Sequence, residues 1–456
     1  MKCLRVYRIP YIENPVNVFE RLEPHRDHIY LLESVEGPER LAKYSFIGFN
    51  PQRRVSIKNG VARLTSLDSG RETVQEVEDP LKILRELVQE GRQSLNRLRL
   101  VGGAVGYISY DAVRYWEKLP NNAVDDSEYP DIEMAIFTEG IVIDHTERQT
   151  YYYSQGEGGV SSLREIFRKK PAERARLKYT KPRLNMSRGE FLESVLKAKD
   201  YISSGEIFQV VLSKRYSFNF EGPLIDFYKT LKEINPSPYM FYLKLGERQL
   251  VGSSPEMLIR VEGDLLETYP IAGTRPNTED PERNRLLAEE LLSDHKERAE
   301  HVMLVDLARN DLGKVSEYGT VQVPEFMRIH RYSHVQHIVS RVTGRLRRGR
   351  DCFDAFKAML PAGTVSGAPK PRAMTIIEEL EPTRRGPYAG AAGYFSFNGN
   401  SDLAITIRTL TANMDEAAIQ VGAGIVADSD PEREWSETEH KAAALMEALA
   451  RAGEKV

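Results

Sequence analysis

Apolar residues in the first 150 positions mostly recur at every second position, in short runs that end at turn residues. The runs are HIYLLES, YSFIGFNP, RRVSIKNGVARLTSL, VGGAVGYISYD and IEMAIFTEGIVIDH. A period of two predicts strands with one buried face, and Asn59-Gly60 between two alternating runs predicts a hairpin turn. Residues 80–93 differ, because apolar positions spaced by three and four follow Asp79-Pro80. That spacing predicts a helix with proline at its first position.

The rest of the chain divides at two points. Residues 155–186 are polar and basic and lack a sustained apolar stripe, which indicates a connecting segment with a short helix in its first half at most. Ser187 and Glu190 then predict a capping box at the start of a helix. Strand-like runs, two long helices, further strands and a final amphipathic helix follow.

This order predicts an N-terminal part over residues 1–154, the connecting segment over 155–186, and a second part over 187–456. The strands are spaced too irregularly for a repeating strand–helix–strand array. We therefore expect an α+β fold with large antiparallel sheets.

Composition and charge narrow the function classes. The chain has 456 residues and 41% hydrophobic content, enough for a large core, and its net charge of -4 argues against a nucleic-acid-binding protein. Its two cysteines, Cys3 and Cys352, are too few for a disulfide framework and have no metal-binding spacing, which favours a reducing cytoplasm. Because the sequence contains neither a signal-peptide pattern nor an apolar run of about 20 residues, we expect no membrane segment.

The motif DPER occurs at residues 280–283 and 430–433, and each copy predicts a helix start, because Asp favours the N-cap and Pro the first turn. The two predicted helices carry two glutamate pairs, Glu297 with Glu300 and Glu434 with Glu437. A spacing of three residues places both carboxylates of a pair on one helix face. If the faces converge, the charges require a hard cation such as Mg2+. The alternative is two ordinary solvated helix faces.

Glycines and basic residues supply candidate contacts to an anionic substrate. Gly422-Ala423-Gly424 follows a strand-like run, where glycines let backbone N–H groups approach an anion closely. Residues 361–370, PAGTVSGAPK, form a second turn-rich stretch with hydroxyl groups and a lysine. Arg408 and Tyr388 are candidates to hold a carboxylate, which an arginine fork binds through two hydrogen bonds. The alternative for both stretches is a tight turn without a ligand.

Together these stretches resemble the chorismate-utilising enzyme family, which contains anthranilate, aminodeoxychorismate, isochorismate and salicylate synthases. The motifs that carry the resemblance over residues 187–447 are SGEIFQVVLSKR, GSSPEM, PIAGT, KERAEHVMLVDLARNDLG, YSHVQHIVS, PAGTVSGAPKPRAM, RGPYAGAAGYF, AITIRT and GAGIVADSDPEREWSET. LLES and YSFIGFNP resemble the regulatory half of the same family. The resemblance implies an α+β fold whose large antiparallel sheets pack as a sandwich flanked by helices.

The resemblance also implies a role for each candidate residue. Glu300 and Glu437 would bind Mg2+ directly, with Glu297 and Glu434 supporting it through water. The ring carboxylate of chorismate would bridge the metal and the backbone of Gly422, Ala423 and Gly424. The other implied substrate contacts are Tyr388 and Arg408 at the enolpyruvyl carboxylate, Lys441 beside the acidic cluster, and Thr274 and Ala272 in PIAGT.

Two positions separate the reactions within the family. Glu256 in GSSPEM matches the acid that protonates the leaving 4-hydroxyl, and neighbouring anions and apolar groups should raise its pKa. Relatives that add water have a lysine where Gln209 stands, and relatives that aminate C4 have one where Ala272 stands. Ammonia should therefore add directly at C2, as in the anthranilate synthases.

Two further residues have expected roles. His337 is expected to assist pyruvate elimination, unless it is only a core histidine. Thr364 is expected to contact the enolpyruvyl side or the C4 oxygen.

Regulation and partners follow from the same resemblance. LLES matches a tryptophan-sensing motif, and its Glu33 would pair with the amino group, unless LLES is only a strand end with exposed polar residues. The expected tryptophan contacts are Leu32, Glu33 and Ser34 with Pro238, Tyr239 and Met240, the last suited to an aromatic ring. Because no glutaminase motif such as GxCxG occurs, a separate glutamine amidotransferase subunit would supply ammonia within a hetero-oligomer.

Alternatives stay open. An aminodeoxychorismate synthase can keep a tryptophan pocket, and a synthase that stops at 2-amino-2-deoxyisochorismate would share most of these residues. A third alternative, from another class, is a non-catalytic module that binds tryptophan or a metal. The set Glu256, Glu300, Glu437, Arg408 and Lys441 favours an enzyme.

Overall fold

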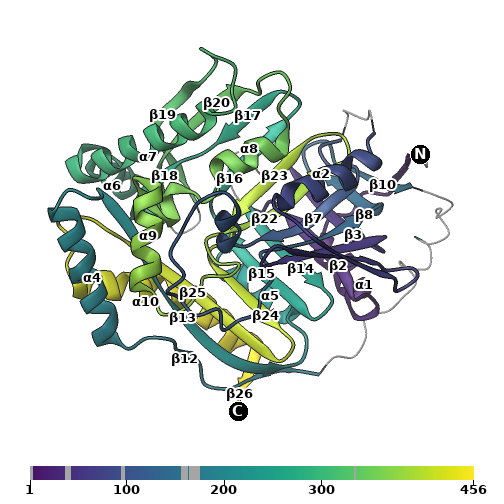
Figure 1. Ribbon diagram of the computed structural model, residues 1–456, viewed down its shortest axis with the longest axis horizontal. Helices are drawn as coiled ribbons and strands as arrows, with labels where there is room; N and C mark the ends of the chain where they lie inside the picture. The colour runs from purple at the N-terminus through teal and green to yellow at the C-terminus, as the bar shows by residue number, and fades with distance from the viewer. Residues whose placement is uncertain (1–3, 36–42, 94–97, 156–162, 164–174, 333–334) are drawn as a thin grey trace.

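The structure is a computed structural model that describes residues 4–35, 43–93, 98–155, 163, 175–332 and 335–456. Two large sheets, of 14 and 12 strands among the described residues, form its centre (Figure 1). Within those residues, every pairing between named strands is antiparallel except that of β11 with β26. The expected α+β fold with large antiparallel sheets is therefore confirmed.

The first sheet follows the order β1 (Leu4–Ile9), β10 (Gln149–Gln155), β9 (Glu139–Asp144), β3 (Tyr44–Phe49), β2 (His28–Glu33), β14 (Tyr239–Leu245), β15 (Arg248–Ser254), β24 (Thr409–Asn413), β25 (Glu416–Ile425), β13 (Gln209–Glu221), β11 (Leu177–Tyr179) and β26 (Gly453–Lys455). The short strands β12 (Arg183–Leu184) and β21 (Gly367–Ala368) also pair with β13.

The second sheet follows the order β18 (Ile271–Pro276), β20 (Val335–Arg345), β17 (Leu265–Thr268), β16 (Met257–Glu262), β23 (Ser401–Ile405), β22 (Ala391–Ser396), β7 (Gly103–Ile108), β8 (Ile132–Phe137), β4 (Arg53–Lys58), β5 (Val61–Ser66) and β6 (Glu72–Glu76), and β19 (Gln322–Arg331) pairs with β20. Both sheets take strands from residues 1–154 and from residues 187–456. The predicted division into two parts is untested, and most of the connecting segment lies outside the described residues.

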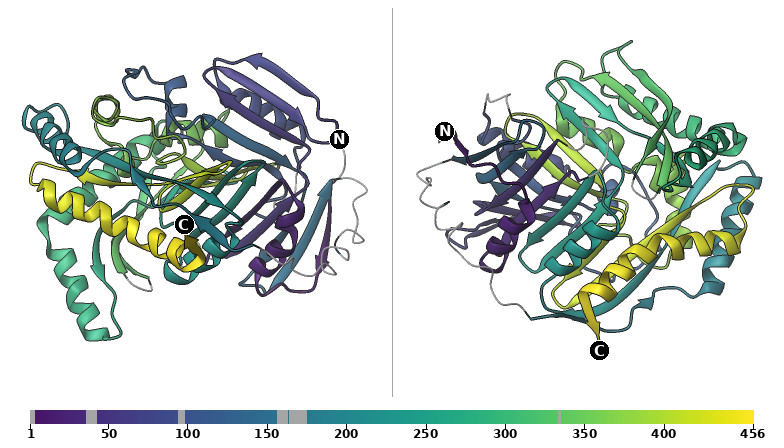
Figure 2. Two further views of the ribbon diagram at one scale, coloured as in Figure 1. Left: turned by 90° about the horizontal axis from the view of Figure 1, so that it is seen from below. Right: turned by 180° about the vertical axis from the view of Figure 1, so that it is seen from behind.

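The helices are α1 (Pro15–Leu22), α2 (Pro80–Glu90), α4 (Arg188–Ser203), α5 (Ile225–Ile234), α6 (Pro281–Ser293), α7 (His295–Gly313), α8 (Cys352–Met359), α9 (Lys370–Leu380) and α10 (Pro431–Ala452), with short helical turns η1 (Glu23–His25), η2 (Tyr110–Tyr115) and η3 (Gly363–Val365). Helices α1, α5 and α10 cover one face of the first sheet, as Figure 2 shows.

Strand alternation explains this layering. In β2, Ile29 and Leu31 pack on the helix-covered side, whereas Tyr30 belongs to the core shared by the two sheets, where its ring centre lies 4.8 Å from that of Phe137 on β8. Each face of the strand therefore buries its own apolar set, as the period-two pattern predicts.

Several local predictions are confirmed. Asp79 caps α2, the Ser187–Glu190 capping box begins α4, and Asn59 and Gly60, with φ of 48° and 77°, connect β4 to β5. The sequence analysis did not predict the β19–β20 hairpin. The described end of the segment 155–186 adds β11 and β12 to the first sheet instead of acting only as a connection.

Candidate active site

The first glutamate pair lies on α7 and not on the helix that begins at Pro281. Helix α6 ends at Ser293, and the side chain of Asp294 accepts hydrogen bonds from the backbone N–H groups of Lys296 and Glu297. The prediction of one continuous helix was wrong, because this strong N-cap residue begins a new helix. Glu297 and Glu300 still lie three residues apart on α7.

The two glutamate pairs converge from α7 and α10. Burial and then the carboxylate of Glu297 raise the pKa of Glu300, and the charge of Glu437 acts in the same direction. Burial also raises the pKa of Glu434, again with a contribution from Glu437. Because the charge of Glu437 acts on both Glu300 and Glu434, helices α7 and α10 bring these carboxylates to one region of the molecule. Glu434 is buried, so the alternative of a solvated helix face does not describe it, whereas Glu437 is exposed, and a metal at this cluster stays a prediction.

The donor set fits Mg2+ in one specific way. Among the described residues, no group of three or more His, Cys, Asp or Glu side chains lies close enough to hold a metal together. Mg2+ is usually bound by one or two carboxylates and completes its octahedron with water and substrate oxygens. Two direct glutamates, with the others acting through water, would satisfy that preference. Glu297 also forms an ion pair with Arg275, whose Nη1 lies 3.5 Å from its Oε1.

Lys441 joins the carboxylate cluster to β25. Its Nζ lies 2.7 Å from Oε1 of Glu437 and donates a 3.0 Å hydrogen bond to the carbonyl oxygen of Gly422. The charge of Lys441 thus compensates one carboxylate at the edge of the glycine-containing strand. This placement agrees with the position that the sequence analysis gave it beside the acidic cluster.

Gly422 and Gly424 lie inside β25 and not in a tight turn. Among the described strands, β25 pairs beyond Ile419 with β13 alone, and on this stretch the carbonyl oxygen of Gly422 accepts the hydrogen bond from Lys441. A methyl group on Gly422 would lie 2.7 Å from the Tyr388 hydroxyl, and one on Gly424 would lie 2.7 Å from Nε2 of Gln209. Only glycine lets both side chains approach the strand this closely.

Glu256 is the buried acid of the site. Thr364, on η3, donates a 2.8 Å hydrogen bond to its Oε1. Burial raises the pKa of Glu256 to about 7, although this hydrogen bond and the charges of Arg408 and Lys441 favour the ionised form. The predicted direction of the pKa change agrees, but its cause differs in part: the charges that act on Glu256 are cationic, and burial outweighs them.

Arg408 is a half-buried cation without a protein carboxylate. Its φ of 49° lies in the left-handed region, which a non-glycine residue adopts at a cost in free energy. Burial lowers its pKa, whereas the charge of Glu256 raises it. Within the described part of the chain, its guanidinium makes no hydrogen bond or ion pair. A guanidinium in this state is suited to binding a substrate carboxylate.

His337 faces the bulge of β18. Its Nδ1 lies 2.8 Å from the carbonyl oxygen of Gly273 and 3.1 Å from Oγ1 of Thr274, and because a carbonyl only accepts, Nδ1 carries the proton. Burial lowers the pKa of His337 to about 4, and the charge of Arg408 adds to this effect. Its neutral ring therefore has an unprotonated Nε2. Ala272, which precedes the bulge, is buried opposite Ile338 on β20.

The predicted tryptophan residues surround a separate small cavity of about 30 Å3. Its lining includes Leu32, Glu33 and Ser34 together with Tyr239 and Met240, but not Pro238. The volume is that of about one water molecule, so an indole requires side chains to move.

The Glu33 carboxylate already accepts hydrogen bonds from Tyr228 and, at 2.9 and 3.0 Å, from Lys232. Because Lys232 compensates its charge, Glu33 is not free to pair with an amine. This finding argues against the role predicted for it.

Two further predictions concern membrane segments and cysteines, and the structure bears on them within the described residues. No helix there is long and apolar enough to cross a membrane. Cys352 is a buried free thiol, whereas Cys3 lies outside the described residues.

A sandwich of two antiparallel sheets that holds a buried acid, an unpaired arginine and a cluster of carboxylates defines an enzyme class that acts on a small anionic substrate. The sequence matches the chorismate binding enzyme family over residues 27–447, and the chain belongs to this family.

Relatives named as two different synthases are similar to the chain over nearly its full length. Anthranilate synthase component 1 of Methanothermobacter thermautotrophicus is 45% identical, covering 99% of this chain and 97% of the relative. Aminodeoxychorismate synthase component 1 of Bacillus subtilis is 42% identical, covering 97% and 96%. The crystal structure of anthranilate synthase component I from Streptococcus pneumoniae is 36% identical, with a TM-score of 0.80 over 96% of this chain and 99% of that one. These similarities establish the family and fold but not the reaction.

Proposed function

We propose that the chain converts chorismate and ammonia to anthranilate, pyruvate and water as a Mg2+-dependent lyase in the cytoplasm, the first step from chorismate to tryptophan. The observation that carries the proposal is Glu256, whose pKa is raised by burial to about 7, so that a carboxylic acid is available at neutral pH. The uncharged residues Gln209 and Ala272 support ammonia addition at C2, because neither can act as a base or nucleophile.

In the first half of the reaction, Glu256 donates its proton to the 4-hydroxyl oxygen while the C4–O bond breaks and water leaves. Thr364 donates its hydroxyl hydrogen to Oε1. The acidic proton of the carboxyl group is therefore directed to Oε2. This arrangement orients the acid towards a fixed point in the site.

Ammonia forms the C2–N bond in the same half-reaction and needs no base to attack, because its lone pair is free. The ammonium group formed at C2 then returns one proton to the Glu256 carboxylate, which gave its own proton to the leaving hydroxyl. Oε1 of Gln209 is buried and has no hydrogen-bond partner among the described atoms. A buried acceptor of this kind can take an N–H group from ammonia and hold the nitrogen near C2. This interaction explains the value of an uncharged amide at this position.

In the second half, the C2 proton is removed and the bond between the ring and the enolpyruvyl oxygen breaks, which makes the ring aromatic. The released enolate takes up one proton at its methylene carbon and becomes pyruvate. The neutral His337 accepts this proton at Nε2, because Nδ1 is held as a donor by the carbonyl of Gly273. Arg408 and Tyr388 bind the enolpyruvyl carboxylate. Glu300 and Glu437 would hold Mg2+ directly and Glu297 and Glu434 would support it, and the ion would supply positive charge for the ring carboxylate.

The partner is a glutamine amidotransferase subunit in a hetero-oligomer, which supplies ammonia to this site. The component 1 names of the relatives support a second component. Tryptophan acts as a feedback inhibitor at the cavity beside Leu32, Ser34 and Met240. A velocity and chorismate KM that do not change when tryptophan is added would refute this regulatory role.

The test of the reaction is incubation of the full chain with chorismate, Mg2+ and ammonium, followed by identification of the product. Anthranilate is expected and is distinguished by its fluorescence and mass. The second candidate is an aminodeoxychorismate synthase, which the Bacillus subtilis relative supports. An unaromatised amine with the mass of 2-amino-2-deoxyisochorismate or its 4-amino isomer would contradict the proposal.

A further inference from the structure

Arg385, the first residue of the motif RGPYAGAAGYF, is a buried cation that has no part in the reaction steps proposed above. Its exposed fraction is 3%, and it lies between the end of α9 and Tyr388. Its Nε and Nη2 donate to the Glu381 carboxylate at 2.9 and 2.6 Å. This buried ion pair fixes the plane of the guanidinium group.

The remaining side-chain hydrogen bonds of Arg385 reach other segments of the active site. Its Nη1 donates to the carbonyl oxygen of Val365, and its Nη2 to that of Val211, both at 2.7 Å. The guanidinium carbon also lies 5.7 Å from the ring centre of Tyr388. Val365 follows Thr364, and Val211 lies two residues after Gln209. One side chain thus touches the segments that carry the acid's hydrogen-bond donor, the amide and the substrate-binding tyrosine.

Glu381 extends this connection into the first sheet. Its Oε1 accepts hydrogen bonds from the backbone N–H and the hydroxyl of Ser213, at 2.7 and 2.9 Å. Ser213 lies directly opposite Gly422 in the β13–β25 register. The ion pair is therefore also tied to the strand that carries Gly422 and Gly424.

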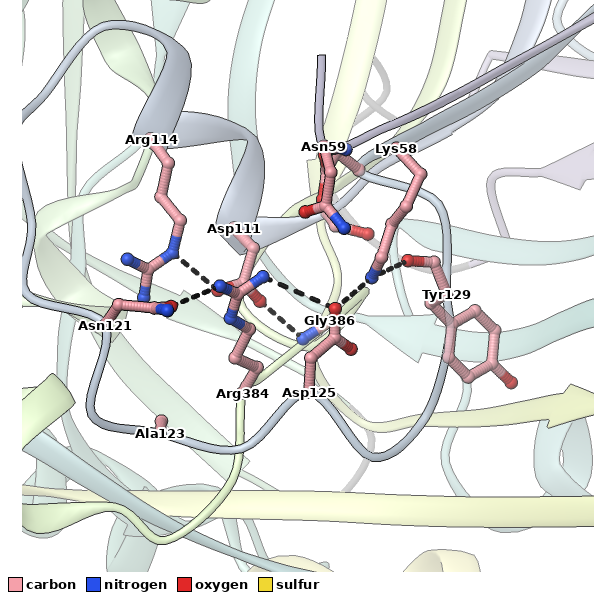
Figure 3. Close-up of polar contacts among 12 residues, drawn as sticks. Lys58, Asn59, Asp111, Arg114, Asn121, Ala123, Asp125, Tyr129, Arg384 and Gly386 are labelled. Atoms are coloured by element: carbon pink, nitrogen blue, oxygen red, sulfur yellow. Dashed lines mark hydrogen bonds and ion pairs between the residues drawn. The ribbon is translucent and has the colours of Figure 1, made fainter. Parts of the chain in front are cut away.

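The residues on either side of Arg385 are themselves fixed. Gly386 donates from its backbone N–H to Oδ2 of Asp111 at 2.9 Å, and Arg384 lies between Asn121 and Asp125, with 3.3 Å between Nη1 and Oδ2 of Asp125 (Figure 3). The backbone at Arg385 is thereby anchored to residues of the N-terminal part. A rigid base of this kind lets the side chain define distances within the site.

We propose that Arg385, held by Glu381, is a positioning residue that fixes Thr364 and its partner Glu256 relative to Gln209 and Tyr388. A guanidinium suits this task, because its planar group points five N–H donors in fixed directions. A lysine in its place would keep the charge but not the set of directions. The inference rests on the proposed function for the choice of assay.

The test compares the full-length variant Arg385→Lys with Arg341→Lys, a matched control. Arg341 also pairs with a buried glutamate, Glu267, in the second sheet, but contacts none of the proposed catalytic residues. With chorismate, Mg2+ and ammonium, R385K is expected to lower kcat by about 10²-fold, because small misplacements of reacting groups have effects of that size. Its dissociation constant for chorismate, measured by calorimetry, changes far less, and R341K keeps the wild-type kcat.

A pH profile separates positioning from a general loss of structure. If Thr364 moves with Val365, Glu256 loses a hydrogen bond that favours its ionised form, so the alkaline limb of kcat/KM moves to higher pH in R385K. R341K leaves the limb unchanged. A limb that stays at the wild-type pH in R385K, or a wild-type kcat in this variant, would overturn the proposal.

Chemical rescue provides the second measurement. Arg385 lines a cavity of about 430 Å3 whose wall also includes Thr406 and the exposed Arg183. Solvent can therefore reach the space that Arg385→Ala opens. Millimolar guanidinium is expected to restore much of the kcat lost in R385A, but none of any loss in R341A.

The outcomes distinguish the two proposals. If guanidinium restores nothing in R385A although its thermal midpoint shows a folded protein, the positioning role is refuted. If R385A does not fold, the kcat and the pH profile of R385K decide the positioning role, and the thermal midpoint of R385K shows whether that variant is folded. If the wild-type chain turns chorismate into another product, the proposed function fails, and the same comparison on that reaction still decides the role of Arg385.

Discussion

The hydroxyl of Thr364 donates a 2.8 Å hydrogen bond to the carboxyl group of Glu256 across 108 residues of sequence. The two residues come from η3 and from the turn between β15 and β16. Burial raises the pKa of Glu256 and this hydrogen bond lowers it, so the balance near pH 7 depends on their contact.

Replacing Glu256 with glutamine should remove the acid while keeping its shape. We expect E256Q to lower kcat/KM by about 10²–10⁴-fold, the usual contribution of a general acid. Chorismate binding, measured by calorimetry, should stay close to wild type. Glu262→Gln, at the exposed end of β16, is the control and should retain full activity. A fully active E256Q would exclude Glu256 as the acid.

The rate should depend on pH through the same residue. Because Glu256 acts in its protonated form, kcat/KM per unit of unprotonated ammonia is expected to fall as the pH rises through about 7. Expressing rates in this way removes the ammonium equilibrium of the substrate itself. The falling limb should disappear in E256Q. A wild-type rate that rises steadily to pH 9 would contradict the assignment.

Thr364→Val should shift this limb. Removing a hydrogen bond to the ionised carboxylate raises the pKa of Glu256 further, so the limb of kcat/KM moves to higher pH. Thr364→Ser keeps a hydroxyl group and should leave the limb near its wild-type position. Equal limbs in the valine and serine variants would show that the hydrogen bond does not tune the acid.

Metal dependence should distinguish direct from water-mediated glutamates. Removal of divalent cations by a chelator is expected to abolish activity, and added Mg2+ to restore it. Glu434→Gln should raise the Mg2+ concentration for half-maximal activity by about 10–100-fold, the size typical of residues that act through a ligand or water. Glu300→Gln and Glu437→Gln should raise it more. The reverse order would exchange the two roles.

Arg408→Lys should weaken substrate binding. A lysine keeps the charge but cannot form the two parallel hydrogen bonds of a guanidinium. A charge-assisted hydrogen bond contributes about 1.5–3 kcal/mol, so KM for chorismate should rise by about 10–100-fold. Steady-state kinetics measure this effect, and R341K again serves as the control. An unchanged KM would place the carboxylate elsewhere.

Much of the local structure could be predicted from short-range signals. The N-caps at Asp79 and Ser187 and the Asn59-Gly60 turn each depend on residues within four positions, so the sequence reveals them directly. Asp294 offered the same kind of signal, yet the surrounding helical pattern concealed it. A strong N-cap residue inside such a pattern was the available clue.

The long-range relationships were less accessible. The role of Arg385 depends on carbonyl oxygens of Val211 and Val365, and no pattern of side chains in the sequence indicates where a carbonyl points. Likewise, pairing of Glu33 with Lys232 depends on how α5 packs against β2. The resemblance to a family supplied the residues of the site, but not these hydrogen bonds.

Strand β2, which carries the predicted tryptophan-sensing residues, is hydrogen-bonded to β14 with Glu33 directly opposite Met240, and β14 continues through β15 to Glu256. An engineer who wants to remove this predicted site cannot simply cut away the first 154 residues, because each sheet would lose five strands at one end and would expose β14 and β22 as new edges. We expect variants without the proposed feedback to come from single substitutions around the small cavity. In a recombination between relatives, the two parts would have to match at the strand pairs where these blocks meet, β2 with β14 and β22 with β7.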